Sequence, residues 1–161
     1  MLSIQTVKPD TLELLKAISV QPEVQETRLV GGTSLALQYG HRQSVDFVDY
    51  SRYPWIDEPV QGEGFVLASD KDIAAMKVNA IIGRGTRKDF IDLYALLRHY
   101  SLPEIMEFYR QKYPEFSEYR ALLSMTYFED AEMQDMPLMF IDTPWEEMKK
   151  AIIRAVEAYQ R

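Results

Sequence analysis

The sequence predicts an α+β protein in which a small sheet is followed by a helical C-terminal half. The three short apolar runs that are typical of strands, residues 27–30, 45–50 and 65–68, all precede residue 69. From there on, apolar residues recur with the period of helices, and strands followed by helices are typical of an α+β fold. The 161 residues suffice for a sizeable core. We divide them into a core, residues 1–100, and a helical C-terminal extension, residues 101–161.

Composition and charge exclude several classes of function. The chain has no cysteine, which removes disulfides, thiolate metal sites and cysteine nucleophiles. Its net charge of −7 argues against broad electrostatic binding of nucleic acid. The imbalance is uneven, because residues 1–100 hold 11 Lys/Arg and 13 Asp/Glu and residues 101–161 hold 7 and 12, so a local basic patch remains possible in the first part. Since no apolar run approaches the roughly 20 residues of a membrane span and the start lacks the regions of a signal peptide, we expect a cytoplasmic protein without a membrane partner.

The N-terminal part begins with a helix in which Pro9 suits the first turn and leucines form a stripe to about Val20. The elements expected after it are a strand at 27–30, a glycine turn at 31–32, a helix at 35–39 ended by Gly40, a strand at 45–50, a loop at 53–64 and a strand at 65–68.

The C-terminal part is expected to be helical. Ser69 can cap a helix whose third position is Asp72, and Thr86 can cap the next one. The expected helices run from Ser69 to a break at Gly83, from Thr86 to about His99, from Pro103 to Tyr113, over 116–128, and from Pro144 to the C-terminus. Residues 129–143 are acidic and rich in methionine without a clean period, which predicts an irregular connection.

The glycine turn is the first candidate site. Gly31 and Gly32 follow an apolar run and precede Thr33 and Ser34, so the turn and the start of the next helix could hold phosphate through backbone N–H groups. Two glycines also occur where a turn merely needs positive φ. The phosphate interpretation therefore depends on partners elsewhere in the chain.

Two cations are candidates for those partners. Lys77 lies among alanines and apolar residues, where it could hold a triphosphate as a point charge, and Arg84 could extend that positive edge. The alternative is a lysine that snorkels to solvent.

Two acids lie three residues apart in the following helix. Asp89 is explained as a first-turn acid that matches the helix dipole, whereas Asp92 falls between Ile91 and Leu93 near the apolar stripe. A carboxylate there needs a cationic partner, and we expect Lys77 or Arg84 to supply it.

Asp46 and Asp49 are the candidate metal ligands. Magnesium chemistry on a triphosphate uses carboxylates that converge on the ion. Residues an odd number apart on a strand point to opposite faces, so both can bind one ion only if a bulge intervenes. Of the two histidines, His41 could touch substrate or be a surface residue, and His99 fits a helix end.

Together these stretches resemble the AbiEii/AbiGii toxin family of nucleotidyltransferases, within the polymerase-β-like superfamily. The resemblance rests on LVGGTSLALQYGHRQSVD (residues 29–46), on LASDKDIAAMKVNAIIGRGTRKDFIDLYALL (67–97) and, more weakly, on residues 127–152. It implies a small mixed nucleotidyltransferase-like sheet with flanking helices. It also implies Mg²⁺-dependent transfer of a nucleotide from a nucleoside triphosphate to an acceptor, in some relatives tRNA, and a cognate antitoxin as partner.

The resemblance also implies roles for residues. By position, Gly31 and Gly32 match the family's glycine turn, and Ser44 and Asp46 match its Ser-x-Asp. Lys77 would hold the phosphates, Asp46 the metal, and Asp92 would be a catalytic or organising carboxylate.

The chain departs from the family pattern after Asp46. The family usually has Asp-x-Asp there, then a helix and further strands with a third carboxylate, before the lysine helix. Here 31 positions separate Asp46 from Lys77, and SVDFVDYSRYPW resembles a join between the first motif and a later strand. On this interpretation, Asp46 or Asp49 stands where the family has its third carboxylate. Two interpretations stay open: a shortened, catalytically inactive binding or regulatory protein, or a chain from which an internal segment is absent.

Overall fold

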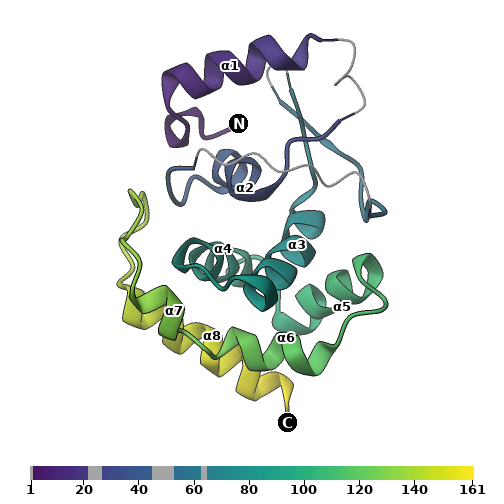
Figure 1. Cartoon of the computed structure of the whole chain (residues 1–161), viewed down its shortest axis with the longest axis vertical. Coiled ribbons are helices and arrows are strands. Elements are labelled where there is room, and N and C mark those ends of the chain that lie inside the picture. The colour runs from purple at the N-terminus through teal and green to yellow at the C-terminus, as the bar shows by residue number, and fades with distance from the viewer. Residues whose placement is uncertain (1, 22–26, 45–52, 63–64) are drawn as a thin grey trace.

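The structure is a computed structural model, and it describes residues 2–21, 27–44, 53–62 and 65–161. It confirms an α+β fold in which helices predominate. The N-terminal helices and the small sheet lie at one end of the molecule, and the C-terminal helices lie at the other (Figure 1). Among the described residues, no helix combines the length and the apolar character needed to cross a membrane.

The N-terminal part contains a short 3-10 helix (Ile4–Thr6), α1 (Pro9–Ser19), α2 (Gly31–Tyr39), β1 (Val60–Gln61) and β2 (Val66–Leu67). β1 and β2 are antiparallel, with Val60 opposite Leu67. Leu29 extends this sheet on the other side of β2 as a single parallel bridge, where its N–H donates to Val66 O at 2.6 Å. The sheet is therefore mixed.

Several predictions about strands change. The expected strand at 65–68 is confirmed as β2, whereas the one at 27–30 is reduced to the bridge at Leu29. β1 lies within residues 53–64, which the sequence predicts to be loop, because pairing with β2 extends a segment that is rich in proline and glycine. The strand expected at 45–50 lies outside the described residues.

The C-terminal part is helical, as predicted. Its helices are α3 (Asp70–Gly83), α4 (Arg87–Leu97), α5 (Leu102–Lys112), α6 (Glu118–Met125), α7 (Glu129–Glu132) and α8 (Trp145–Tyr159). The short α7 corrects the prediction that all of residues 129–143 are irregular.

Local capping explains where these helices begin. The Ser69 hydroxyl accepts from the Asp72 N–H at 3.1 Å, and Thr86 forms a reciprocal capping box with Asp89. Such caps satisfy N–H groups that have no partner within the helix. They fix where α3 and α4 begin. These two helices carry the candidate site residues Lys77, Asp89 and Asp92.

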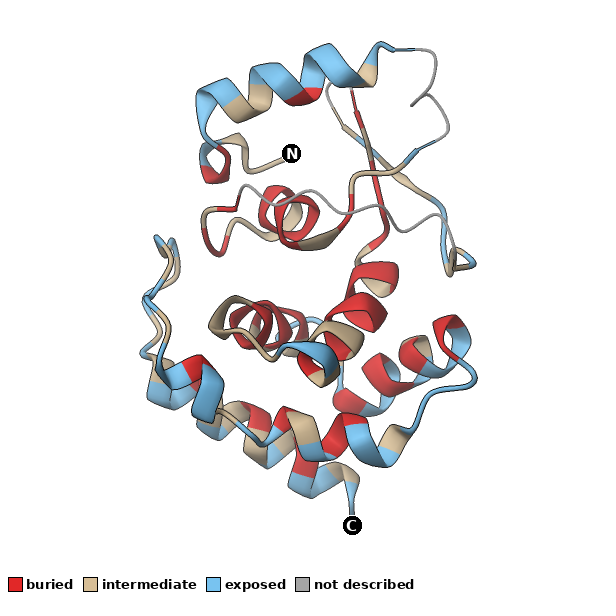
Figure 2. Ribbon diagram, viewed as in Figure 1, coloured by how far each residue is buried: buried red, intermediate tan, exposed pale blue. Residues whose placement is uncertain are grey.

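The core is centred on α3, which packs against α2, α4, α5 and α6. Figure 2 shows that α3 is buried along most of its length, which is expected of a helix surrounded by other elements. The hydrophobic cluster around α3 extends from Val30 to Val156, across residue 100. The division into domains at residue 100 stays a prediction.

The chain's two tryptophans lie in different surroundings. Trp55 is flanked by two cations, with Arg28 4.4 Å and Lys112 4.7 Å from its ring centroid. Trp145, at the start of α8, packs edge-to-face against Phe128 with the ring centroids 6.0 Å apart.

Candidate functional site

The glycine turn forms the beginning of α2. The sequence predicts a helix that begins after the glycines, but α2 begins at Gly31. Gly31 has φ = 71°, a conformation that favours glycine, and no described atom lies within 4 Å of the position that a Cβ would occupy. Gly32 faces the opposite constraint, because a Cβ there would lie 2.9 Å from Ser44 Oγ and would collide with the Arg42 guanidinium. The start of α2 is thus open at one glycine and closely packed at the next.

The hydroxyl groups that follow the glycines point into the protein. Thr33 and Ser34 are buried, and Thr33 Oγ1 donates to Ser44 Oγ at 3.3 Å. Ser44 is also buried. Ser44 therefore lies beside Gly32 and Thr33, at the start of α2.

Asp92 is the centre of a buried network of charges. Its Oδ1 accepts from Arg42 Nε at 2.7 Å and lies 2.6 Å from His41 Nε2. Its Oδ2 accepts from Arg42 Nη2 at 2.8 Å and pairs with Lys77 Nζ at 2.7 Å. Burial alone would raise the pKa of Asp92, but the charges of Lys77 and Arg42 outweigh it and hold the pKa well below its usual value.

Lys77 lies between two carboxylates and is almost fully buried. Besides Asp92, its Nζ contacts Asp89 Oδ1 at 3.0 Å. Burial lowers the pKa of Lys77, yet the charges of Asp92 and Asp89 outweigh that effect and raise it. The lysine is therefore charged and paired within the protein, and it does not snorkel to solvent.

Asp89 joins this network to the surface. Arg84 donates from Nε to Asp89 Oδ2 at 2.9 Å, and the Arg84 side chain is 58% exposed. Burial would raise the pKa of Asp89, but the charge of Lys77 and the hydrogen bonds from Arg84 and Thr86 lower it. Among the described residues of this network, three cationic side chains (Arg42, Lys77 and Arg84) face two carboxylates.

The structure answers the question of which cation neutralises Asp92. Lys77 does so, as one of the two expected partners, whereas Arg84 pairs with Asp89. Arg42 is a third cation, which sequence reasoning did not assign to the site. Its guanidinium touches the glycine turn and also binds Asp92, so it connects the two candidate regions.

The structure excludes the alternative in which His41 is a surface residue. Arg42 is fully buried, and His41 is 2% exposed. His41 Nε2 lies 2.6 Å from Asp92 Oδ1, and its buried Nδ1 has no hydrogen-bond partner among the described residues. Arg42 and Asp92 are about fifty positions apart, so no local pattern in the sequence predicts that they pair.

The predicted metal ligands Asp46 and Asp49 lie outside the described residues. Within the described part of the chain, no group of three or more His, Asp or Glu side chains could hold a metal ion. The carboxylates of Asp89 and Asp92 do not fit Mg²⁺ as they stand, because both oxygens of each already accept from cationic or hydroxyl donors. A metal site would have to use carboxylates outside the described ranges.

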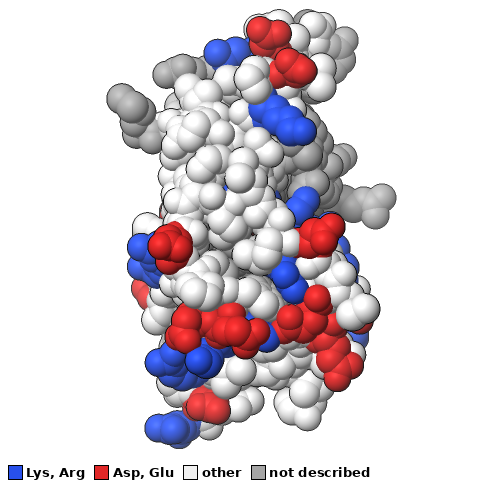
Figure 3. Space-filling view, turned by 90° about the vertical axis from the view of Figure 1, so that its left-hand side faces the viewer, with Lys and Arg blue, Asp and Glu red and all other residues white. Residues whose placement is uncertain are grey.

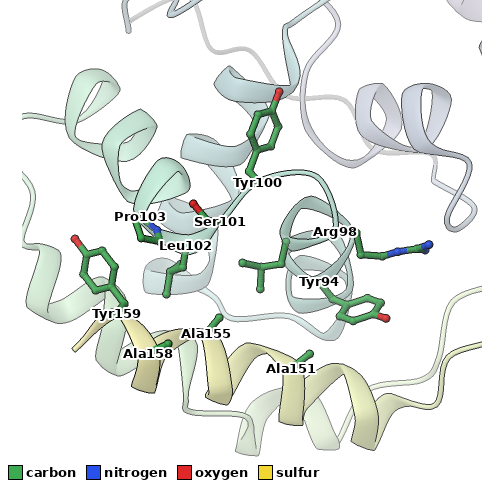
Figure 4. Close-up of a pocket in the computed structure, with 11 residues that line it drawn as sticks. Tyr94, Arg98, Tyr100, Ser101, Leu102, Pro103, Ala151, Ala155, Ala158 and Tyr159 are labelled. Atoms are coloured by element: carbon green, nitrogen blue, oxygen red, sulfur yellow. The ribbon is translucent and has the colours of Figure 1, made fainter. Parts of the chain in front are cut away.

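A separate pocket of about 470 Å³ opens between α4, the start of α5 and α8. Its floor is largely apolar, and three alanines of α8 contribute to it: Ala151, Ala155 and Ala158 (Figure 4). The pocket contains none of the predicted site residues. We therefore place the candidate functional site at the glycine turn and the Asp92 network.

Comparisons with known proteins agree with the resemblance. Residues 56–161 match the family described as nucleotidyl transferase AbiEii toxin, type IV TA system. The match includes α3 and α4 but not the glycine turn or Ser44. The chain is also similar to the uncharacterized protein aq_aa25 of Aquifex aeolicus (strain VF5), with 28% identity over 205 positions that cover 97% of this chain and 98% of the relative. No solved structure matches it.

Proposed function

Since the chain belongs to the AbiEii nucleotidyl transferase toxin family, we propose that it binds a nucleoside triphosphate at the glycine turn of α2. We further propose that it transfers a nucleotide to an RNA acceptor such as tRNA, or to a protein, as the toxin of a toxin–antitoxin pair. The observation that supports this most is that the Arg42 guanidinium lies against Gly32 of the glycine turn, beside Ser44, and binds Asp92, which also pairs with Lys77.

The charge and geometry of the site suit a phosphate. The open side of Gly31 gives access to the first turn of α2, where backbone N–H groups and the helix dipole attract anions. Among the described residues, Arg42 is the cation that lies against Gly32, and Lys77 lies behind it in the network. A triphosphate at Gly31 would thus accept hydrogen bonds from backbone N–H groups of α2. The guanidinium of Arg42 would lie on the far side of these groups and attract it.

Asp92 acts in this proposal as an organising carboxylate. It binds Arg42 through two oxygens, which holds the guanidinium against the glycine turn, and it keeps Lys77 charged. Lys77 supplies its charge from within the network, and Arg84 supplies an exposed positive group at the edge. Direct contact of Lys77 with phosphate would require its Nζ to exchange a carboxylate for the ligand.

Magnesium, which the family implies, would supply a positive charge that orients and neutralises the triphosphate. By resemblance, Asp46 and Asp49 would hold it. The carboxylates of Asp89 and Asp92, which already accept from cationic and hydroxyl donors, do not fit the ion.

A second function, a catalytically inactive nucleotidyltransferase-fold protein that binds or regulates a partner, is favoured by two observations. Lys77 and Asp92 neutralise each other within the protein. In addition, the alignment with the Aquifex aeolicus protein spans 205 positions although this chain has 161 residues, so the relative has residues inside the aligned region that this chain lacks.

Thermal unfolding with each of the four nucleoside triphosphates, with and without MgCl₂, tests nucleotide binding. We expect a triphosphate and magnesium together to raise the melting temperature, because a ligand that binds only the folded state stabilises it. Lys77→Ala should abolish the rise that the nucleotide causes, measured from the variant's own baseline. The matched control Lys71→Ala removes an exposed lysine that pairs with Asp57 and should leave the rise unchanged.

Ser44→Ala, which removes a hydroxyl beside the turn, provides a second variant if Lys77→Ala does not fold. Absence of a shift with all four nucleotides would contradict the proposal. Incubation of the protein with labelled nucleotides and total RNA then separates the two functions, because label transferred to RNA supports the transferase, and nucleotide binding without transfer to RNA or protein supports the inactive binder.

A further inference from the structure

The segment between α7 and α8, residues 133–143, returns from the helical end of the molecule to the candidate site. In Figure 1 it rises beside α4 toward the chain that follows α2. Its backbone pairs with residues 41–43, since Gln43 N–H donates to Leu138 O at 2.8 Å and Phe140 N–H donates to His41 O at 3.0 Å. We call residues 138–140 the bridging strand.

The bridging strand leaves one of its edges open. Arg42 lies opposite Met139 in the antiparallel bridge, and the two hydrogen bonds lie on either side of this pair. In that arrangement the N–H and C=O of the central residues point away from the partner strand. The N–H and C=O of Met139 therefore point outward, and no described residue hydrogen-bonds to them.

The side chains around this edge are apolar and accessible. Met133 is 89% exposed, Met136 41%, Leu138 59% and Phe140 43%. Four large apolar side chains are thus exposed within eight residues, and an exposed apolar patch is typical of an interaction site. Leu138 and Phe140 lie on the same face of the bridging strand, as alternate residues do.

The surroundings of the edge are acidic. Asp130, Asp135 and Asp142 are exposed and form no ion pair with a described residue. Figure 3 looks onto this side of the molecule and shows a broad uncharged area bordered below by a row of acidic side chains. Phosphate groups would be repelled here, whereas Lys and Arg side chains would be attracted.

We propose that the bridging strand docks an extended segment of a partner protein, in which apolar residues alternate with Lys or Arg. The partner's backbone would pair with Met139, which adds a strand at the open edge. Its apolar side chains would cover Leu138 and Phe140, and its basic side chains would face the surrounding aspartates. This inference does not depend on the nucleotide site.

The probe is a fluorescein-labelled octapeptide that alternates valine and lysine, titrated with the full chain and followed by fluorescence anisotropy. A peptide that alternates valine and glutamate has the same strand propensity and the opposite charge. We expect the lysine peptide to bind more weakly as salt is raised, and the glutamate peptide not to bind.

Met139→Pro is the sharpest variant, because proline removes the outward N–H and leaves both hydrogen bonds to residues 41–43 intact. We expect it to weaken binding by about tenfold or more. Leu138→Ser should also weaken binding. Its matched control is Leu123→Ser, because Leu123 on α6 is exposed to the same extent, 59%, and should have no effect.

Three outcomes would overturn the proposal. The first is that the lysine peptide does not bind, or binds equally well to Met139→Pro and Leu138→Ser. The second is that a single-stranded RNA oligonucleotide binds and loses affinity with the same variants, which would mark an RNA surface. The third is that sedimentation shows a dimer that Met139→Pro dissociates, which would make a second copy of the chain the occupant. If circular dichroism shows that Met139→Pro is unfolded, Leu138→Ser against Leu123→Ser decides the test.

Discussion

Replacing Asp92 by asparagine would remove the only carboxylate that binds both Arg42 and Lys77 among the described residues. The side chain keeps its shape, but Arg42 and Lys77 lose the carboxylate that they share, and the new amide N–H₂ faces their donors, while Lys77 keeps its contact with Asp89. Removing one partner of a buried ion pair typically costs about 3–5 kcal/mol. For a chain of this size, that corresponds to a fall in melting temperature of roughly 6–20 °C.

The measurement is urea unfolding of the wild type and the variant at neutral pH. The matched control is Asp57→Asn, because Asp57 forms an ion pair of the same length with Lys71, at 2.7 Å, but its side chain is 44% exposed. An exposed pair contributes little, typically below about 1 kcal/mol. If Asp92→Asn costs no more than Asp57→Asn, the network does not hold the folded state together and our account of the site is wrong.

The pH dependence gives an independent check. The pKa of Asp92 is lower in the folded protein than its unfolded value of about 3.9, so the carboxylate contributes stability that is present above this value and is lost as the pH falls through the folded pKa. The difference in unfolding free energy between the wild type and Asp92→Asn should therefore be constant near neutrality and shrink in acid. A difference that grows on acidification would contradict the depressed pKa.

Two further variants probe the elements that hold the site. Gly32→Ala places a methyl group against Arg42, which cannot move aside without leaving Asp92. We expect the free energy of unfolding in urea to fall by about 1–3 kcal/mol. The control is Gly83→Ala, which should not be destabilising, because no described atom lies within 4 Å of the added methyl group. Thr86→Ala removes the α4 cap and should cost about 1 kcal/mol, whereas Thr86→Ser should restore most of it; equal stability of the two variants would show that the capping hydroxyl is not used.

Local signals in the sequence predict much of this fold. The caps at Ser69 and Thr86 depend on residues three positions apart, so the starts of α3 and α4 can be predicted from short stretches. The glycine turn and its neighbour Ser44 are likewise predictable, because they lie in one continuous stretch. One cationic partner of Asp92, Lys77, could be predicted, since a helical carboxylate near an apolar stripe must be neutralised by a neighbouring element; its second partner, Arg42, could not.

Contacts between distant residues were beyond such reasoning. His41 and Arg42 follow a helix-ending glycine, and their polarity predicts exposure to solvent. Both are instead buried and bind Asp92, about fifty residues away in the sequence. The sheet is hard to predict for the same reason. The parallel bridge at Leu29 and the strand at Val60 both form by pairing with β2, and local sequence does not reveal this pairing. In both cases the deciding interaction is tertiary, and the local pattern favours a different answer.

The positions of the two tryptophans make the protein's own fluorescence a reporter of how its parts unfold. Trp55 contacts Arg28 from the N-terminal part and Lys112 from α5, whereas Trp145 packs among aromatic rings of the helical end. In Trp55→Phe only Trp145 emits, and in Trp145→Phe only Trp55 does. Coincident denaturation curves from the two single-tryptophan proteins would mean one cooperative unit. Separated curves would mean that the regions before and after residue 100 unfold as distinct bodies.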